Sequence, residues 1–287
     1  MSRGLVLAVL VVVGCSSKRE PARDQPPAPK PLTVPKPPAW QPPASLPAGQ
    51  HLGFVPDGIA ARVGHPQGII AIDLRAFKLD PLLALIPDPF ACTRDLLKYM
   101  GVVVVAGPPI VVYATQLSEI GTKQCLDEIA PLIGARSGPA RDGSYTIGAD
   151  GEGASLRWDS GVLTAHELGT PAPGPEPADA ELLELMNHVP PQAPGFVLVK
   201  GDAAHTVKSL VAWFRIDSHA LYLSSRVEGT TAGAARGKIR DFIEGFKEGA
   251  AKKHIAVDDS WFKETDTDRV STVESRIPLS AIGAGRK

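Results

Sequence analysis

The chain has 287 residues, with 30 lysines and arginines against 31 aspartates and glutamates. This near-balance gives no broad basic footprint, and we therefore expect no nucleic-acid partner. Beyond the first 14 residues no apolar run approaches the roughly 18 residues that a membrane-spanning helix needs, so none is predicted there.

The first residues form the pattern of a secretory signal peptide. Arg3 supplies a positive charge, and an apolar run follows over residues 5–13. As a helix this run would span only ~14 Å at 1.5 Å per residue, whereas a bilayer core needs roughly 20 residues. We therefore interpret residues 1–14 as a signal peptide that is removed, and not as a transmembrane anchor.

The signal ends in Val12-Val13-Gly14-Cys15, which resembles the lipobox of bacterial lipoproteins. The resemblance implies cleavage before Cys15 and attachment of a diacylglyceryl group to its sulfur. Anchoring by two or more acyl chains is stable, whereas anchoring by one is marginal. Some inner-membrane lipoproteins carry Asp directly after the lipidated cysteine. This chain has Ser16 there instead, and the absence of Asp favours the outer membrane and a periplasmic or surface-facing position. The alternative is an ordinary cysteine after an ordinary secretory signal.

Residues 15–50 are interpreted as the lipidated cysteine and a tether that leads to the folded part. The segment from Glu20 to Gly49 is dense in proline and lacks apolar periodicity, so we expect it to be extended, solvated and disordered. At ~3.1 Å per residue, about 30 residues reach at most roughly 90 Å. The tether leans basic, so attraction to anionic lipid head groups is an alternative to simple solvation.

The remaining sequence predicts an α+β fold of two similar lobes, at 51–168 and 179–287, joined by a proline- and glycine-rich linker at 169–178. In both lobes the predicted order is strand, helix, hairpin and helix, followed by further strands. Each lobe is expected to be a mostly antiparallel sheet with helices packed on one face. The pattern indicates an internal duplication, although strands and helices also alternate by chance in many chains.

The elements of the first lobe are predicted from apolar runs and turn residues. In chain order they are a strand at 68–73, a helical stretch at 81–86, a hairpin of strands at 102–106 and 110–114, a helix at 118–133, and strands at 144–147, 155–158 and 162–166. Ser118 is expected to cap the long helix. Cys125 and Leu132 fall on the face of that helix that is expected to meet the core.

The elements of the second lobe follow from the same signals. In chain order they are a helix at 179–188, a strand at 195–200, a short helix at 203–211, a hairpin of strands at 213–216 and 219–223, a long helix ending near 253, and strands at 255–257, 261–263 and 269–277. Thr230 or Thr231 is expected to cap the long helix. Ile239 and Ile243 recur on one face of it at helical spacing.

Cys92 and Cys125 are the two cysteines that remain beyond Cys15. In an exported protein an even pair predicts a disulfide. Cys92 lies in a stretch that is longer in the first lobe than in the second, so the bridge would join that stretch to the helix that carries Cys125. The alternatives are two separate buried thiols, or a metal pair without its other ligands.

No metal or cofactor site is predicted from the spacing of ligand residues. The seven histidines are dispersed, without an H-x-x-x-H or H-E-x-x-H pair, and no C-x-x-C is present. These histidines are His51, His65, His166, His188, His205, His219 and His254. An acidic group near the end of the chain offers oxygen ligands for calcium but lacks the glycine and glutamate of an EF-hand loop. It consists of Asp258, Asp259, Glu264, Asp266 and Asp268, and solvated loop charge is the better interpretation.

The catalytic motifs present are incomplete. Ser260 and Lys263 have the S-x-x-K spacing of penicillin-recognising enzymes, but the S-D-N and K-T-G companions are absent from the sequence. Thr231 occupies the place of the serine in a G-x-S-x-G elbow. The glycines at 233 and 237 are one residue too close for a phosphate loop, and Ile239 replaces its Ser or Thr.

These observations favour a membrane-anchored envelope lipoprotein whose folded part is a non-catalytic binding or scaffolding module for a protein or a cell-wall partner. The alternative is a lipid-anchored periplasmic or surface hydrolase with no recognisable motif. An enzyme should bring polar groups with perturbed pKa values together in a concave pocket. A binding module should carry an exposed apolar patch.

Replacement of Cys15 tests the anchor. In Cys15→Ala the acceptor sulfur is gone, so we expect an unprocessed precursor or a chain recovered in the soluble fraction, measured by membrane fractionation and mass spectrometry of the N-terminus. Processing and membrane association equal to those of the unchanged chain would contradict the lipobox interpretation.

Overall fold

The computed structural model describes residues 52–77, 86, 88–201, 206–217, 219–251 and 256–278. Cys15, the signal peptide and the tether lie outside the described residues, and so does the predicted helix at 81–86 except for Ile86.

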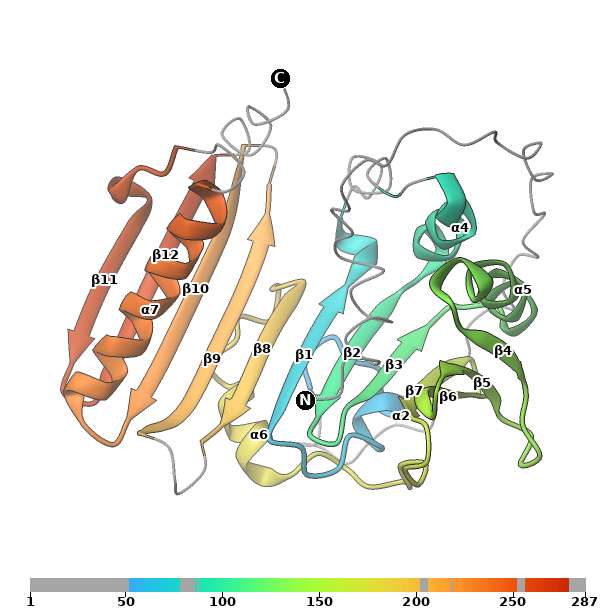
Figure 1. Ribbon diagram of the computed structural model, residues 1–287. Helices are drawn as coiled ribbons and strands as arrows, with labels where there is room; N and C mark the ends of the chain where they lie inside the picture. Colours follow the sequence, from blue (N-terminus) through green and yellow to red (C-terminus); the bar gives the residue numbers. More distant parts are fainter. Residues whose placement is uncertain are drawn as a thin grey trace. The chain divides into compact units, whose positions relative to one another are not determined.

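The fold is α+β, with one sheet in the strand order β11-β12-β10-β9-β8-β1-β2-β3-β7-β6-β5-β4 (Figure 1). Each strand pair whose register is described is antiparallel. This confirms the predicted fold class and the antiparallel pairing. The two similar lobes and the internal duplication stay predictions.

Two compact units divide the chain, and they are interleaved along the sequence. Within the described residues the first unit holds 88–103 and 109–173, and the second holds 52–77, 104–108 and 174–278. Strand β2 (Val102–Gly107) is shared between them. The predicted boundaries at 51–168, 169–178 and 179–287 stay a prediction.

The first unit consists of antiparallel strands covered by two helices. Its helices are α4 (Ala91–Tyr99) and α5 (Glu119–Ile129), and its strands are β3 (Val111–Thr115), β4 (Arg136–Pro139), β5 (Tyr145–Ala149), β6 (Glu152–Asp159) and β7 (Val162–Glu167). Leu96 and Ile129 from the helices pack with Leu156 and Leu163 from the strands. The Ser118 side chain accepts a hydrogen bond from the Gly121 N–H, which confirms the predicted cap of α5.

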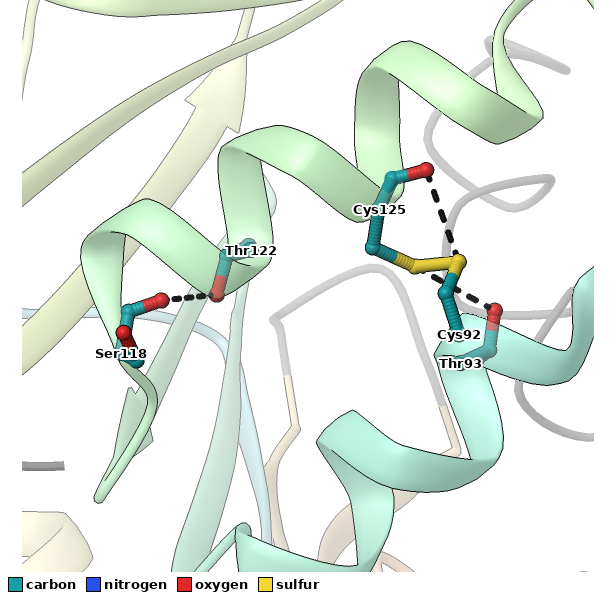
Figure 2. Close-up of a disulfide and its surroundings, with 5 residues drawn as sticks. All are labelled: Cys92, Thr93, Ser118, Thr122 and Cys125. Atoms are coloured by element: carbon teal, nitrogen blue, oxygen red, sulfur yellow. Dashed lines mark hydrogen bonds between the residues drawn. A yellow bond between two sulfur atoms is a disulfide. The ribbon is translucent and has the colours of Figure 1, made fainter. Parts of the chain in front are cut away.

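A disulfide joins the two helices of this unit, as predicted. Cys92 on α4 and Cys125 on α5 are bonded, with their Cα atoms 5.4 Å apart and both side chains buried (Figure 2). The Thr93 hydroxyl lies 3.9 Å from the Cys125 sulfur. Helix α4 itself was not predicted, so the bridge joins two helices.

The second unit has helices on both sides of its strands. Its helices are α2 (Asp57–Ala60), α6 (Ala180–Met186) and α7 (Ala232–Ala251), and its strands are β1 (Gly68–Asp73), β8 (Gly195–Lys200), β9 (Val207–Ile216), β10 (Ala220–Gly229), β11 (Phe262–Thr267) and β12 (Val270–Pro278). Helix α7 runs along β10 and β12 (Figure 1), where Ile239 and Ile243 pack on Val227 and Val273. Helix α6 packs on β8 and β9 instead.

Three predicted features are wrong. The predicted helix at 203–211 is strand β9 from Val207 onward. Leu132 is 55% exposed, because α5 ends at Ile129 and a short 3-10 turn at Pro131–Ile133 replaces its last turn. The described part of the predicted strand at 255–257 has no strand conformation.

Removal of the disulfide should destabilise the chain. Closing a loop of about 34 residues is worth ~3 to 4 kcal/mol in the chain-entropy model, so the variant Cys92→Ala/Cys125→Ala should unfold at a correspondingly lower urea concentration. The reduced wild-type chain serves as control and should show a similar loss. Equal free energies of unfolding for the oxidised chain, the reduced chain and the variant would contradict a stabilising bridge.

Candidate functional site

An apolar strip lies on the α7 side of the second unit. Side chains directly opposite each other on paired strands point to the same side of a sheet. Val227 packs against α7, and its partner Leu210 is opposite Val199. The same alternation places further apolar residues of the central strands on that side. The strip comprises Ile70, Ile72, Val197, Val199, Leu210, Ala212, Phe214 and Ile216.

Helix α7 leaves much of this strip uncovered. Ile70 is 43% exposed and Ile216 is 44% exposed, whereas the residues beneath the helix, such as Val227 and Val273, are 1% and 0% exposed. Val197, Ala212 and Phe214 are half-buried. Contiguous exposed apolar side chains of this kind mark binding surfaces more often than isolated ones do.

An aromatic pair closes one end of the strip. Phe214 and Phe77 stack with their ring centroids 5.8 Å apart. The Phe214 ring lies over Gly195 on the neighbouring strand, where a Cβ atom would approach the ring to 2.1 Å. Gly195 is therefore required for the ring position, because any larger residue would displace Phe214 from the strip.

A cavity of about 220 Å³ adjoins the other end of the strip. Its lining includes Val199, Val207 and Leu210 together with Lys238 from α7 and the backbone turn at Gly201. Residues 202–205, which follow Gly201, lie outside the described residues. The described lining contains no carboxylate, histidine or cysteine. The cavity thus extends the apolar surface and supplies a cation at its rim.

A separate polar cluster holds the N-terminal segment of the second unit in place. His65 lies 3.0 Å from a Glu176 oxygen and 3.4 Å from an Asp179 oxygen. Asp179 also accepts from the Leu182 N–H at the start of α6 and pairs with Lys200. The Gly64 N–H donates to the Glu176 carbonyl at 2.7 Å. These bonds fasten residues 60–65 to the beginning of α6.

The electrostatics of this cluster are those of a structural ion pair. Burial by itself raises the pKa of Asp179, but the bonds from Lys200, from the Leu182 N–H and from His65 outweigh burial and hold that pKa below its ordinary value. Both members of the pair with Lys200 are about 15% exposed. The charged form of Asp179 is thus the one that the fold selects.

The other lowered carboxyl pKa values arise in turns and ion pairs, including that of Asp142, whose pKa is lowered by hydrogen bonds from Ser144 and Arg157. N–H groups of His219 and Ala220 lower the pKa of Asp217, and the Ser260 N–H does the same for Asp258. Ser271 and Arg236 lower the pKa of Asp266. In the described part of the chain these shifted groups belong to turns and ion pairs, and none of them lines the cavity.

The structure disperses the sequence-based candidates. Ser260 lies in a 3-10 turn and Lys263 on strand β11, not one helical turn apart as S-x-x-K chemistry needs. Thr231 accepts from the Ala234 N–H and caps α7. Asp259 pairs with Lys247. Among the described residues, no group of three or more His, Cys, Asp or Glu side chains is placed to hold a metal ion.

The histidines occupy unrelated environments. His166 is buried on β7, and its Nδ1 lies 3.2 Å from both the Glu167 carbonyl and the Thr170 hydroxyl. His188 and His219 are exposed. His51, His205 and His254 lie outside the described residues, as Cys15 does.

Comparison with known proteins supports the fold alone. No model of a protein family and no curated protein matches the chain. The solved structure of TP0453 from Treponema in crystal form III superposes with a TM-score of 0.50 at 8% identity, covering 78% of this chain and 96% of that one. Crystal form I gives a TM-score of 0.45, also at 8% identity, covering 79% of this chain and 95% of that one. The described helices include none that is both long and apolar enough to span a bilayer.

Substitution of Asp179 tests the polar cluster. Asp179→Asn keeps an acceptor for the Leu182 N–H but removes the charge that pairs with Lys200, so the free energy of unfolding at pH 7 should fall by about 1 to 3 kcal/mol. Because the pKa of Asp179 is lowered in the folded chain, its stabilisation is present above the unfolded pKa of about 3.9 and is lost as pH falls through the folded pKa. Urea unfolding should therefore separate the two chains at pH 7 and bring them together towards pH 2. A difference that is independent of pH would contradict this assignment.

Proposed function

We propose that this chain is a lipid-anchored bacterial envelope lipoprotein whose folded part is a non-catalytic binding module for a protein partner. Cys15 carries the anchor, and residues 15–50 let the module stand off from the bilayer. We place it at the outer membrane, facing the periplasm or the cell surface.

The observation that carries the binding role is the apolar strip with its adjoining cavity. Ile70 and Ile216 each expose more than 40% of their surface, and the register places both on the same side of the sheet as Phe214. Protein interfaces are built around such desolvated apolar and aromatic cores with a polar rim. Lys238 and Gln67, which both line the cavity, supply that polar rim.

Two features of the site favour binding over hydrolysis. The cavity lining within the described residues offers lysines, hydroxyl and amide groups and aliphatic side chains, without a general base next to a nucleophile. The carboxyl groups with lowered pKa values belong to turns and ion pairs, and none of them is among the described lining residues. We therefore assign no chemical step to this site.

Site-specific photo-crosslinking in cells tests the proposal. A photoreactive phenylalanine analogue placed at Ile70 or at Ile216 should yield a discrete adduct with one other protein, because a bound partner covers these positions. The same analogue at Leu132, which is 55% exposed in the first unit, is the matched control and should yield no such adduct.

The companion variant Ile70→Asp should abolish the adduct formed from position 216 while leaving the thermal unfolding of the chain nearly unchanged, because Ile70 is exposed. Absence of any adduct at both strip positions, or equal adducts at the strip and at Leu132, would overturn the assignment of this surface.

A further inference from the structure

The side of β10, β11 and β12 that faces away from α7 is an open face. Since Val227 and Val273 point towards α7, their neighbours in the chain point the other way. The register aligns Lys263, Glu274, Ser224 and Trp213 in one row, and Arg276, Tyr222 and Arg215 in the next. Thr265, Thr272 and Arg226 form a third row. Arg276, Glu274, Lys263 and Thr265 are all exposed.

The charged residues of the open face are positive on balance. Its four cations are Arg215, Arg226, Lys263 and Arg276, and its three carboxylates are Glu228, Glu274 and Asp217, the last of which interacts with Tyr222 at the end of the face. Among the described residues, Arg215, Lys263 and Arg276 have no carboxylate within ion-pair distance. Arg226 reaches Glu228 at 3.6 Å through one nitrogen, while its other terminal nitrogen is buried without a hydrogen-bond partner in the described structure. Arg215 and Arg276 are thus the two exposed arginine forks of the described face that remain available to an anion, and Lys263 adds a third free cation.

Aromatic rings and hydroxyl groups lie next to these cations on the open face. The Arg215 guanidinium carbon lies 4.4 Å from the centroid of the Tyr222 ring, in a cation–π contact between neighbouring strands. Trp213 is half-buried in the row next to Arg215 and Tyr222, beside Ser224. Because all these groups stand on paired strands, they form an extended surface and not a pocket for one small ion.

We propose that the open face binds a linear acidic glycan. Arginine forks pair with the carboxylate groups of such a polymer. The indole of Trp213 offers a flat apolar surface for the C–H face of a sugar ring, and the Ser and Thr hydroxyls and Glu274 match sugar hydroxyl groups. The repeated rows suit a polymer that presents the same groups at intervals.

The composition of the face argues against two other anionic partners. None of the exposed large aliphatic residues of the described chain lies here, since Ile70 and Ile216 are on the opposite side and the others are outside β9 to β12. A membrane-docking face or the core of a protein interface would require such apolar surface. The glycan face and the apolar strip thus lie on opposite sides of the sheet and share only strand β9, and this inference does not depend on the proposed protein partner.

The test measures binding of the full processed chain, in detergent, to polygalacturonate as an acidic glycan, to dextran as a neutral one and to poly-L-glutamate as an acidic polypeptide. We expect saturable binding to polygalacturonate that weakens with added salt, and at least about tenfold weaker binding by Arg215→Gln/Lys263→Gln/Arg276→Gln. The control Lys98→Gln/Arg136→Gln/Arg141→Gln removes the same charge from exposed positions of the first unit and should bind within about twofold of the unchanged chain.

The variant Trp213→Leu separates sugar recognition from general charge attraction, because it leaves the charge unchanged. It should weaken binding to polygalacturonate severalfold and leave any binding to poly-L-glutamate unchanged, with circular dichroism confirming that each variant is folded. Two results would overturn the proposal directly: no binding to polygalacturonate, or an equal loss of binding in the two triple variants. The proposal is also overturned if poly-L-glutamate or phosphatidylglycerol bicelles displace the bound polygalacturonate and Trp213→Leu does not weaken its binding. None of these outcomes bears on the crosslinks from Ile70 and Ile216.

Discussion

Side chains of a strand alternate between the two sides of its sheet. In the second unit the elements that cover one side pack on different strands from the elements that cover the other side. On one side α7 buries Val227 and Val273 of β10 and β12. On the other side α6 packs on β8 and β9, which bury Phe196, Leu198 and Val211, and Phe54 of the N-terminal segment contacts Phe196. This offset leaves the central strands open on the α7 side and the outer strands open on the α6 side. Both candidate binding surfaces follow from it.

The N-terminal segment matters to this arrangement because it completes one of the two covers. Leu52 and Ile59 are fully buried, and the Ala178 N–H donates to the Ala60 carbonyl at 3.2 Å. The tether predicted for residues 15–50 therefore ends almost directly at a core residue. A membrane anchor attached there would be connected to packed structure, with the ion pairs of Asp179 and His65 holding the junction.

The sequence predicted secondary structure correctly where a single signal was strong, such as a helix-capping residue or a continuous β-branched run. Ser118, Thr231 and the β-branched run of β2 fall as predicted, because a cap or a buried strand needs only local residues. Only the second half of strand β9 was predicted as a strand, at 213–216. Its first half was interpreted as part of a helix at 203–211, because both sides of the run are partly apolar and show no clean alternation. Strand β4 has the sequence Arg-Ser-Gly-Pro and little strand propensity of its own. It is a strand because residues 145–148 of β5 pair with it.

The candidate surfaces could not be predicted from the sequence, because they depend on which strands are neighbours and on which side of each strand is covered. In the runs at 69–72 and 196–199 the side chains on both sides of the strand are apolar, which predicts burial on both sides. The pattern does not reveal that one side is only partly covered. The arginines of the open face are far apart in the chain, and Arg215, Arg276 and Tyr222 become neighbours only through the register of three strands. The disulfide was predictable because it needed only a count of cysteines and the expectation, from the first residues, that the chain is exported.

The alternation of side chains also makes the two surfaces independent of each other. Phe214 belongs to the apolar strip, while Trp213 and Arg215 on either side of it belong to the open face. A ligand on one side therefore contacts a set of side chains that a ligand on the other side does not touch. The proposed tethered module would therefore be able to hold an apolar protein surface and a polar polymer at once, on opposite sides of a sheet in which β9 contributes to both. In the proposed scaffolding role, the lipid on Cys15 would set the position of the module, and the opposite sides of its sheet would join the two partners.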